Sequence, residues 1–196
     1  DNLVEFAVMG DIYARDVLGL DNPKIVLLNV GEEEMKGNAV VQEAAAVLRK
    51  APKTLNFQGF IEGDRIIEGE AEVIVTDGFS GNVALKASEG MVNFMITLLK
   101  DAIKSSWLSK LGGLLISRPI RRMRDRINPK HHNGAILIGL GGIAIKSHGG
   151  ADEVAYANAI KVAAQMVSQE NQKQIEEKLH QLSLELEASQ EVNTPY

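Results

Sequence analysis

Apolar positions along the chain alternate between two spacings, one typical of helices and one typical of buried strands. A helical spacing runs through residues 2–20, with Gly19 as the expected stop. The apolar face of this predicted helix carries Leu3, Phe6, Met9, Ile12 and Tyr13. Apolar runs predict strands at "KIVLLNVG", "TLNFQGFI" and "AEVIVTDG", with helices near "NAVVQEAAAVLRKA" and from about Ser80 onward. This alternation of helix and strand predicts an α/β fold.

The second half of the chain predicts two short strands and then a long helix. "GAILIGLGGIAIKSHGG" is typical of two strands joined around residues 139–142. The long helix is expected over residues 151–188, and its last part carries leucines and an isoleucine at coiled-coil spacing. These are Ile175, Leu179, Leu182 and Leu186. The stripe is too short for an independent coiled coil, so we expect it to pack on the core or on a dimer partner.

Residues 1–196 are expected to form a single α/β domain from the C-terminal part of a longer chain. The sequence begins inside a predicted helix and has no initiator methionine, which suggests that part of the sheet lies outside it. A hydrophobic share of 45% and a charged share of 24% are normal for a globular domain. Without cysteine, a thiolate nucleophile, a disulfide and a cysteine-ligated metal are excluded.

Charge and hydropathy exclude further classes of protein. The net charge of -5 argues against a general nucleic-acid-binding protein, so no nucleic-acid partner is expected. No apolar run approaches the roughly 20 residues that span a bilayer, and the first residues do not form a signal peptide. A cytosolic location is therefore the default expectation.

Three segments share the order strand, glycine-containing polar loop, helix start. They are "LLNVGEEEMKGNAVVQEA", "VIVTDGFSGNVALKA" and "IAIKSHGGADEVAYANA". In open α/β sheets the ligand crevice lies outside the carboxyl ends of the strands, so we expect the three loops to face one pocket. Helix N-termini present unpaired N–H groups and a partial positive charge, which favours an anion such as phosphate.

Lys36 is the most informative residue of the first loop. A cation just before a helix start opposes the helix dipole, so an anion nearby would explain its position. Gly37 would let a ligand approach the backbone, and Asn38 is the expected N-cap. The alternative is a solvated lysine on a loop, and the spacing alone favours that interpretation.

In the second loop, Asp77 and Gly78 form a common turn pair, and Ser80 or Asn82 is the expected helix cap. Asn82 and the neighbouring N–H groups, with Lys86 one turn further, would donate to a ligand oxygen if the loop is functional. If it is structural, every one of these residues is a turn former or a cap. The residues alone do not choose between the two.

The third loop contains His148 between Lys146, Ser147 and two glycines. No HExxH or similar spacing accompanies this histidine, so no metal site is predicted. The chain also has no GxSxG nucleophile elbow and no Walker phosphate loop. Residue types and spacing thus predict an anion site in an α/β crevice without specifying a reaction.

Four motifs make the sequence resemble the PlsX-type phosphate acyltransferase family, over about residues 1–165. They are "KIVLLNVGEEEMKGN", "NFQGFIEGDRIIEGEAEVIVTDGFSGNVALK", "IKSHGGAD" and, at their centre, "VIVTDGFSGNVALKASEG". The resemblance implies that Lys36, Asp77 and Asn82 are the catalytic residues. It also implies a substrate and phosphate site formed by Gly37, Asn38, Gly78, Ser80, Gly81, Lys86, His148 and Gly149.

The resemblance further implies a three-layer α/β/α architecture like that of phosphotransacetylase and isocitrate dehydrogenase, and a homodimer. Its expected substrates are acyl-acyl carrier protein and inorganic phosphate, with no cofactor, and a glycerol-3-phosphate acyltransferase would act downstream. The sequence departs from the family in two places. The N-terminal part with its "MGGD" motif is absent, and Gly150 and Ala151 stand where many relatives have a hydroxyl.

The reaction implied by the resemblance needs little acid or base assistance. Phosphate is substantially dianionic at pH 7, because its second pKa is about 6 to 7, and a thiol with a pKa of about 8.5 leaves readily as thiolate. Positioning and charge stabilisation would then carry the reaction. Lys36 and two helix N-termini would hold phosphate, Asn82 would donate to the developing oxyanion, and Asp77 would orient Lys36 or the loop.

Residues 96–130 form an amphipathic, basic insert that is expected to fold as a helical hairpin. A solvated basic face on a packed hairpin is one interpretation. The other is contact with an anionic membrane or with the acidic surface of acyl carrier protein, which would make the protein peripherally membrane-associated. The residues expected to make this contact are Trp107, Leu108, Leu111, Leu114, Leu115, Arg118, Arg121, Arg122 and Arg124.

Three other functions remain open from the sequence. A phosphotransacetylase acting on acetyl-coenzyme A would share the fold and the phosphate site but would not need the basic insert. A binding module that holds an anion or acyl carrier protein without turnover is the second. A nicotinamide-dependent dehydrogenase is disfavoured, because no GxGxxG motif follows a strand with an acid about 20 residues further on.

Overall fold

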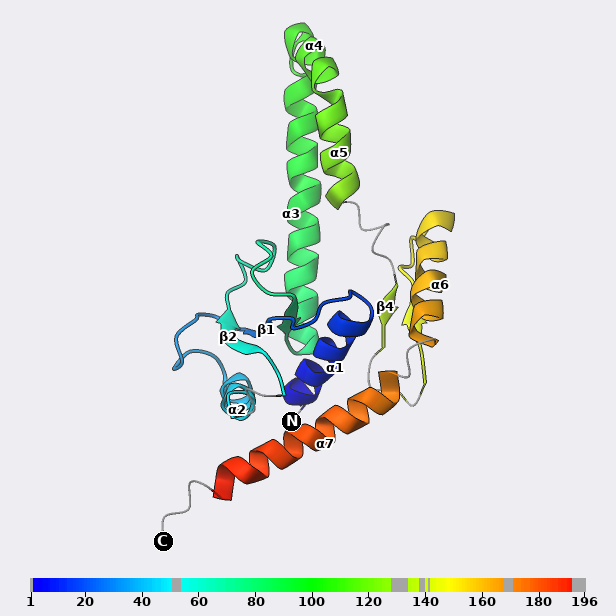
Figure 1. Ribbon diagram of the computed structural model, residues 1–196. Coiled ribbons are helices and arrows are strands. Elements are labelled where there is room, and N and C mark those ends of the chain that lie inside the picture. Colours follow the sequence, from blue (N-terminus) through cyan, green and yellow to red (C-terminus); the bar gives the residue numbers. More distant parts are fainter. Residues whose placement is uncertain are drawn as a thin grey trace.

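The computed structural model describes residues 2–50, 54–127, 134–137, 140, 142–167 and 171–191. Helices and a parallel sheet alternate along the chain, which confirms the α/β fold (Figure 1). The elements are α1 (Asn2–Asp16), β1 (Ile25–Leu28), α2 (Ala39–Leu48), β2 (Phe57–Ile61), β3 (Val73–Val75), α3 (Gly78–Lys104), α4 (Trp107–Leu115), α5 (Ser117–Ile127), β4 (Ala135–Ile136), β5 (Ile145–Lys146), α6 (Glu153–Val167) and α7 (Asn171–Glu191).

The three predicted strands form one parallel sheet in the order β2-β1-β3. β1 pairs with both neighbours, with Ile25 opposite Phe57 in β2 and opposite Val73 in β3. Ile25, Val26 and Leu27 are all buried, because both faces of the central strand are covered. The unbroken apolar run of β1 is what a central parallel strand requires.

The hydrophobic core lies between the sheet, α1, α2 and α7. Helix α1 contributes Leu3, Val4, Ala7, Val8 and Ile12 to this core, whereas Phe6 is 41% exposed. The sequence placed Phe6 on the buried face, which is wrong. Helix α1 contacts β3 and α7 as well as α2, and the neighbouring residues Val4, Val8 and Asp11 are buried instead.

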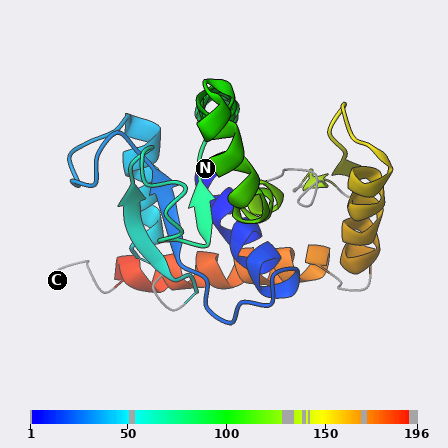
Figure 2. The same ribbon diagram turned by 90° about the horizontal axis from the view of Figure 1, so that it is seen from above.

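Helix α7 crosses under α1 and closes the core, as the leucine stripe predicted (Figure 2). Leu182 is buried, and Ile175, Leu179 and Leu186 pack against the same cluster. The expected single helix over residues 151–188 is wrong. The structure has two helices in this range, α6 and α7, which run in different directions (Figure 1).

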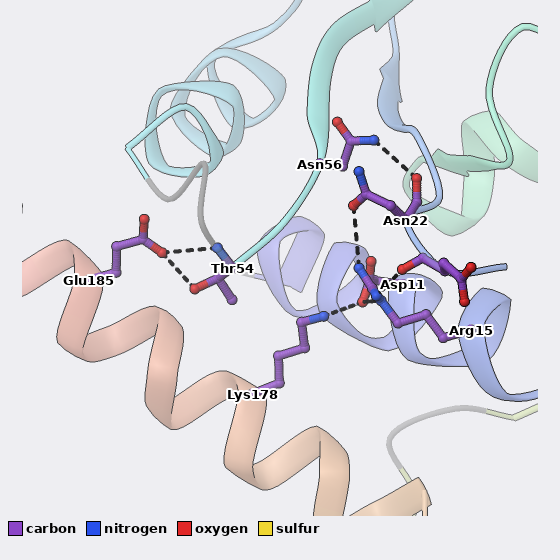
Figure 3. A network of polar contacts seen from close by, with 8 residues as sticks. Asp11, Arg15, Asn22, Thr54, Asn56, Lys178 and Glu185 are labelled. Atoms are coloured by element: carbon purple, nitrogen blue, oxygen red, sulfur yellow. Dashed lines mark hydrogen bonds and ion pairs between the residues drawn. The ribbon is translucent and has the colours of Figure 1, made fainter.

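Polar contacts fix α7 at two points (Figure 3). The Asp11 carboxylate of α1 is fully buried, and its Oδ2 accepts from Arg15 Nε at 2.8 Å and from Lys178 of α7. Asp11 Oδ1 has no hydrogen-bond partner among the described residues. About two turns further along α7, Glu185 accepts hydrogen bonds from the backbone N–H and the hydroxyl of Thr54, at 3.2 and 2.6 Å.

Helices α3, α4 and α5 project away from the sheet, with α5 running back beside α3 (Figure 1). α4 packs on α3 so closely that a Cβ on Gly113 would lie 2.5 Å from Ile103 Cγ2. None of the 27 residues of α3 is buried. Its exposed apolar side chains are Phe79, Val83, Leu85, Met91, Phe94, Met95 and Leu98. Within the described ranges, no helix is both long and apolar enough to cross a bilayer.

The strands predicted on either side of residues 139–142 form an antiparallel pair, β4 and β5, separate from the parallel sheet. Residues 139 and 141 of that connection lie outside the described part of the chain. The β4–β5 pair and α6 lie on the other side of α3 from the parallel sheet (Figures 1 and 2). This position separates the third predicted loop from the first two.

Candidate functional site

A pocket of about 730 Å³ lies at the carboxyl ends of the three parallel strands. Each strand contributes the residues that directly follow it, which are Asn29 after β1, Glu62 after β2 and Thr76 after β3. This is where open α/β sheets bind their ligands. The complete lining is Leu3, Leu28, Asn29, Val30, Gly37, Asn38, Val41, Glu62, Gly63, Asp64, Val75, Thr76, Asp77 and Ser80.

The first loop brings the N-terminus of α2 to the pocket. Asn38 is the N-cap, as predicted, and its Oδ1 accepts from the backbone N–H of Val41 at 2.9 Å. Gly37 has φ +100, a conformation that favours glycine, and a Cβ there would lie 2.3 Å from Asn29 Oδ1. Gly37 and Asn38 both line the pocket, so this loop forms part of its wall.

Lys36 itself is not among the residues that line the pocket. Its Nζ pairs with Glu33 Oε1 at 2.8 Å, and both side chains are largely exposed. The hydrogen bond that Lys36 donates to Glu33 raises the pKa of Lys36, with a smaller contribution from the charge of Glu62, which does line the pocket. Lys36 therefore stands at the rim, with a carboxylate as its present partner.

The second loop positions Asp77 and Ser80 at the start of α3. Asp77 is the N-cap, and its Oδ1 accepts from the N–H groups of Phe79 and Ser80, each at 2.9 Å. The expectation that Ser80 or Asn82 caps the helix is wrong, because the Asp77 carboxylate already reaches two orphan N–H groups of the first turn. The Ser80 side chain and these N–H groups lower the pKa of Asp77.

Replacing Asp77 tests this cap and its pH dependence. Asp77→Ala should lower the free energy of unfolding by about 1 kcal/mol, the usual loss for an N-cap, whereas Asp77→Asn should keep most of it. Because folding lowers the Asp77 pKa, its ionic contribution is present above the ordinary value of 3.8 and disappears as the pH falls through the folded pKa. Urea titrations of the three proteins from pH 7 to 3 measure this difference. An Asp77→Asn profile identical to the parent's would contradict it.

The electrostatics of the pocket are mixed. Three acidic residues line it (Glu62, Asp64 and Asp77), and among the described residues of the lining there is no lysine or arginine. The N-termini of α2 and α3 supply partial positive charge from two directions. A bound phosphate would need Lys36 to turn from Glu33 toward it, since the lining carboxylates repel an anion.

The remaining predicted residues of the second loop lie in the first turns of α3. Gly78 is the first residue of this helix, and Gly81 packs so closely on the strand end that a Cβ would lie 2.5 Å from Thr76 Cγ2. Asn82 is exposed and does not line the pocket. Lys86 is also exposed, where its Nζ pairs with Glu89 at 2.8 Å. The structure therefore brings Ser80, but neither Asn82 nor Lys86, into the pocket.

The third loop does not reach the pocket, so the expectation that three predicted loops share it is wrong. His148 and Gly149 are exposed in the turn between β5 and α6, and His148 Nδ1 accepts from the Gly150 N–H at 3.0 Å. His148 lies near enough to Glu89 of α3 to contribute, after Lys86, to the lowered pKa of that carboxyl. The wall that we expected from this loop is formed instead by residues 62–64, after β2.

Sequence reasoning missed Asn29, Glu62 and Asp64 as pocket residues. Asn29 lies near the end of the predicted strand run "KIVLLNVG", and Glu62 and Asp64 come one and three residues after the run "TLNFQGFI". The rule that strand ends line the crevice identifies these positions, whether or not a helix start follows directly.

Comparisons with known proteins agree with the motifs. Residues 1–174 match the family model described as "Fatty acid synthesis protein". Proteins named "Phosphate acyltransferase" are 52% identical in Paramagnetospirillum magneticum, over 86% of this chain and 48% of that protein, and 48% identical in Rhodospirillum centenum, over 96% and 53%. One in Gluconacetobacter diazotrophicus is 48% identical, over 92% and 48%.

The chain spans about half the length of these curated relatives. The family match nevertheless covers most of the chain, including every residue of the pocket lining. The chain therefore belongs to the phosphate acyltransferase family that its motifs resemble.

Proposed function

We propose that the protein containing this chain transfers an acyl group from acyl-acyl carrier protein to inorganic phosphate, giving acyl phosphate and free carrier protein at the start of phospholipid synthesis. The observation that carries the proposal is the pocket at the carboxyl ends of β1, β2 and β3, into which the N-termini of α2 and α3 point. Relatives that match this region are named for the same activity.

The reaction is a substitution at a thioester carbonyl. A phosphate oxygen forms a bond to the carbonyl carbon, the carbon–sulfur bond breaks, and the carrier leaves as a thiolate that takes up a proton from solvent. Inorganic phosphate is already a sufficient nucleophile at neutral pH, so the protein's contribution is to position the phosphate and to stabilise charge. The reaction needs no thiol from this chain, whose 196 residues contain no cysteine.

Each predicted site residue then has a proposed role in holding phosphate or the thioester. The backbone at Gly37, Asn38 and Gly78 and the Ser80 hydroxyl would hold phosphate, with Lys36 as its cation. Gly81, whose N–H donates to the Asp77 carbonyl at 3.0 Å, would let the helix start pack closely on the end of β3. Asp77 would maintain the start of α3 by capping it. Asn82 would donate to the oxyanion of the carbonyl, and Lys86, His148 and Gly149 would contact the rest of the substrate from outside the pocket.

A hydroxylamine trap for acyl phosphate tests the activity on the full-length protein. Phosphate is supplied with either palmitoyl-acyl carrier protein or acetyl-coenzyme A. Product from the carrier-linked substrate alone supports the proposal. Product from acetyl-coenzyme A alone would assign a phosphotransacetylase, and product from neither would leave a binding module without turnover.

The proposal extends to architecture and assembly. The parallel sheet with helices packed against it is compatible with a three-layer α/β/α fold of the phosphotransacetylase type, with α4 and α5 as an inserted hairpin. We assign the exposed apolar side chains of α3 to a homodimer contact.

A glycerol-3-phosphate acyltransferase would consume the product, and the protein would be cytoplasmic and attached to the membrane surface.

The tip formed by α4 and α5 supports this attachment. Trp107, Leu108, Leu111, Leu114 and Leu115 are all exposed, between 52% and 78%. Arg118, Arg121 and Arg122 are exposed on the adjoining α5, and the side chain of Arg124 lies outside the described part of the chain. Exposed apolar residues next to arginines suit the headgroup region of an anionic bilayer or an acidic carrier protein.

Vesicle flotation tests membrane contact. The parent protein should float with phosphatidylglycerol vesicles and not with phosphatidylcholine vesicles, and Leu111→Glu should reduce the bound fraction about tenfold by placing a charge in the apolar tip. Leu184→Glu on α7 is a matched control, because Leu184 and Leu111 are both 52% exposed. Equal loss in both variants, or no flotation of the parent, would contradict membrane contact by the tip.

A further inference from the structure

The side-chain amides of Asn29 and Gln42 both donate hydrogen bonds to the backbone of residues 31–37, here called the Lys36 loop. Asn29 Nδ2 donates to the carbonyl oxygens of Gly31 at 3.0 Å and Lys36 at 2.9 Å. Gln42 Nε2, from the first turns of α2, donates to the carbonyl oxygens of Met35 at 2.9 Å and Gly37 at 3.3 Å. Three consecutive carbonyls, at residues 35, 36 and 37, are therefore bonded to these two side chains.

Asn29 joins the loop to the sheet at the pocket. It directly follows β1, lines the pocket and spans from one end of the loop, at Gly31, to the other, at Lys36. The contact with Gly37 is so close that only a glycine fits there, since a Cβ would lie 2.3 Å from Asn29 Oδ1. The backbone of Lys36 is thus fixed relative to the strand that forms the floor of the pocket.

Gln42 gives the same loop a second anchor on the helix. Its two acceptors lie on either side of Lys36, and Gln42 is only partly exposed. With both amides in place, the backbone of Lys36 is held by hydrogen bonds, whereas its side chain is held only through the pair of Nζ with Glu33. A change of partner from Glu33 to an anion then requires side-chain rotation alone.

We propose that Asn29 and Gln42 are positioning residues that hold the Lys36 loop in the geometry that binds phosphate. This role rests on the proposed function. Neither residue needs to touch the reacting atoms, because both act through the backbone of residues 31–37. Fixing this backbone before phosphate arrives avoids the entropy cost of ordering the loop upon binding.

Neutral substitutions test the role without adding charge to the pocket. Asn29→Leu and Gln42→Met remove the donors at similar size. Asn56→Leu and Gln58→Met are matched controls, since Asn56 Nδ2 donates to the Asn22 carbonyl at 3.1 Å and Gln58 Nε2 to Asn56 Oδ1 at 2.6 Å, both away from the loop. Gln42→Met keeps the test decisive if Asn29→Leu does not fold.

Hydrogen exchange and steady-state kinetics on the full-length protein are the two measurements. Amide exchange in the peptide that covers residues 31–38 should rise about tenfold in both test variants and stay unchanged in both controls, as expected for the loss of about one net hydrogen bond. The KM for inorganic phosphate should rise about tenfold, while the KM for acyl-acyl carrier protein stays within about twofold.

Two results would overturn the positioning role. One is loop exchange that matches the controls, and the other is faster exchange with an unchanged KM for phosphate. A parent protein that makes no acyl phosphate would contradict the proposed function instead. In that case, isothermal titration with inorganic phosphate would decide the positioning role, because loosening of the loop must still weaken phosphate binding in the two test variants.

Discussion

Replacing Lys178 with methionine is expected to lower the free energy of unfolding by about 3 kcal/mol, because it leaves the buried Asp11 carboxylate with a single cation. Asp11 is fully buried, and Lys178 is 17% exposed. Removing one member of a buried pair typically costs about 3–5 kcal/mol, and Arg15 keeps its bond to Asp11, so we expect the lower end of that range.

The double variant Asp11→Leu with Lys178→Met should regain most of this loss, since an apolar pair needs no desolvation of charge. Lys173→Met is the matched control on the same helix, because Lys173 is exposed and its replacement should change stability by less than about 0.5 kcal/mol. The midpoints of urea unfolding measure the stability of the Lys178→Met, double and Lys173→Met variants, provided that the m-values are unchanged. Equal midpoints for the Lys178 and Lys173 variants would show that the ion pair does not hold α7 in place.

Lys36→Ala should raise the KM for phosphate about 100-fold with the fold intact, since a charge-assisted hydrogen bond to an anion is worth about 1.5–3 kcal/mol. The structure also predicts that a substitution at Glu33 lowers the KM for phosphate. Glu33 now holds the Lys36 ammonium at 2.8 Å and competes with phosphate for it. Glu33→Gln should therefore lower the KM for phosphate by up to about fivefold, the usual limit for an exposed pair.

Initial rates at varied phosphate, with acyl-acyl carrier protein saturating, measure both effects. Glu34→Gln is the control, because Glu34 lies next to Glu33 but pairs weakly with Arg49, at 3.6 Å. Unchanged phosphate kinetics in Lys36→Ala would remove Lys36 from the site. A raised KM in Glu33→Gln would mean that Glu33 orients Lys36 for phosphate instead of competing for it.

The sequence predicted the three strands of the parallel sheet, the order of the elements as far as β5 and the Asn38 cap, because each depends on local spacing. The cap of α3 was assigned wrongly for a reason that is also local. Ser80 and Asn82 are good capping residues, but Asp77 lies directly before Gly78 and reaches two N–H groups first. Phe6 illustrates a tertiary effect, since the packing of β3 and α7 decides which side of α1 is buried.

The least predictable features depend on contacts between distant residues. The pair between Asp11 and Lys178 joins positions 167 residues apart, and neither residue belongs to a motif. The position of the loop that forms the third wall of the pocket depends on the pairing of β2 with β1, two strands that α2 separates along the chain. By contrast, the pairing of Lys36 with Glu33 was readable in "GEEEMKG", where a glutamate three residues earlier is a natural partner for the lysine.

Helix α3 is capped by Asp77 at the pocket and ends next to the α4–α5 tip. Its 27 residues, at 1.5 Å each, span about 40 Å. The tip and the pocket are thus spatially separate, and substitutions at such distances are additive to within about 0.5 kcal/mol. A protein carrying both Leu111→Glu and Lys36→Ala should therefore show the flotation defect of the first single variant and the phosphate KM of the second, so that the proposed surface binding and the proposed turnover could be engineered independently.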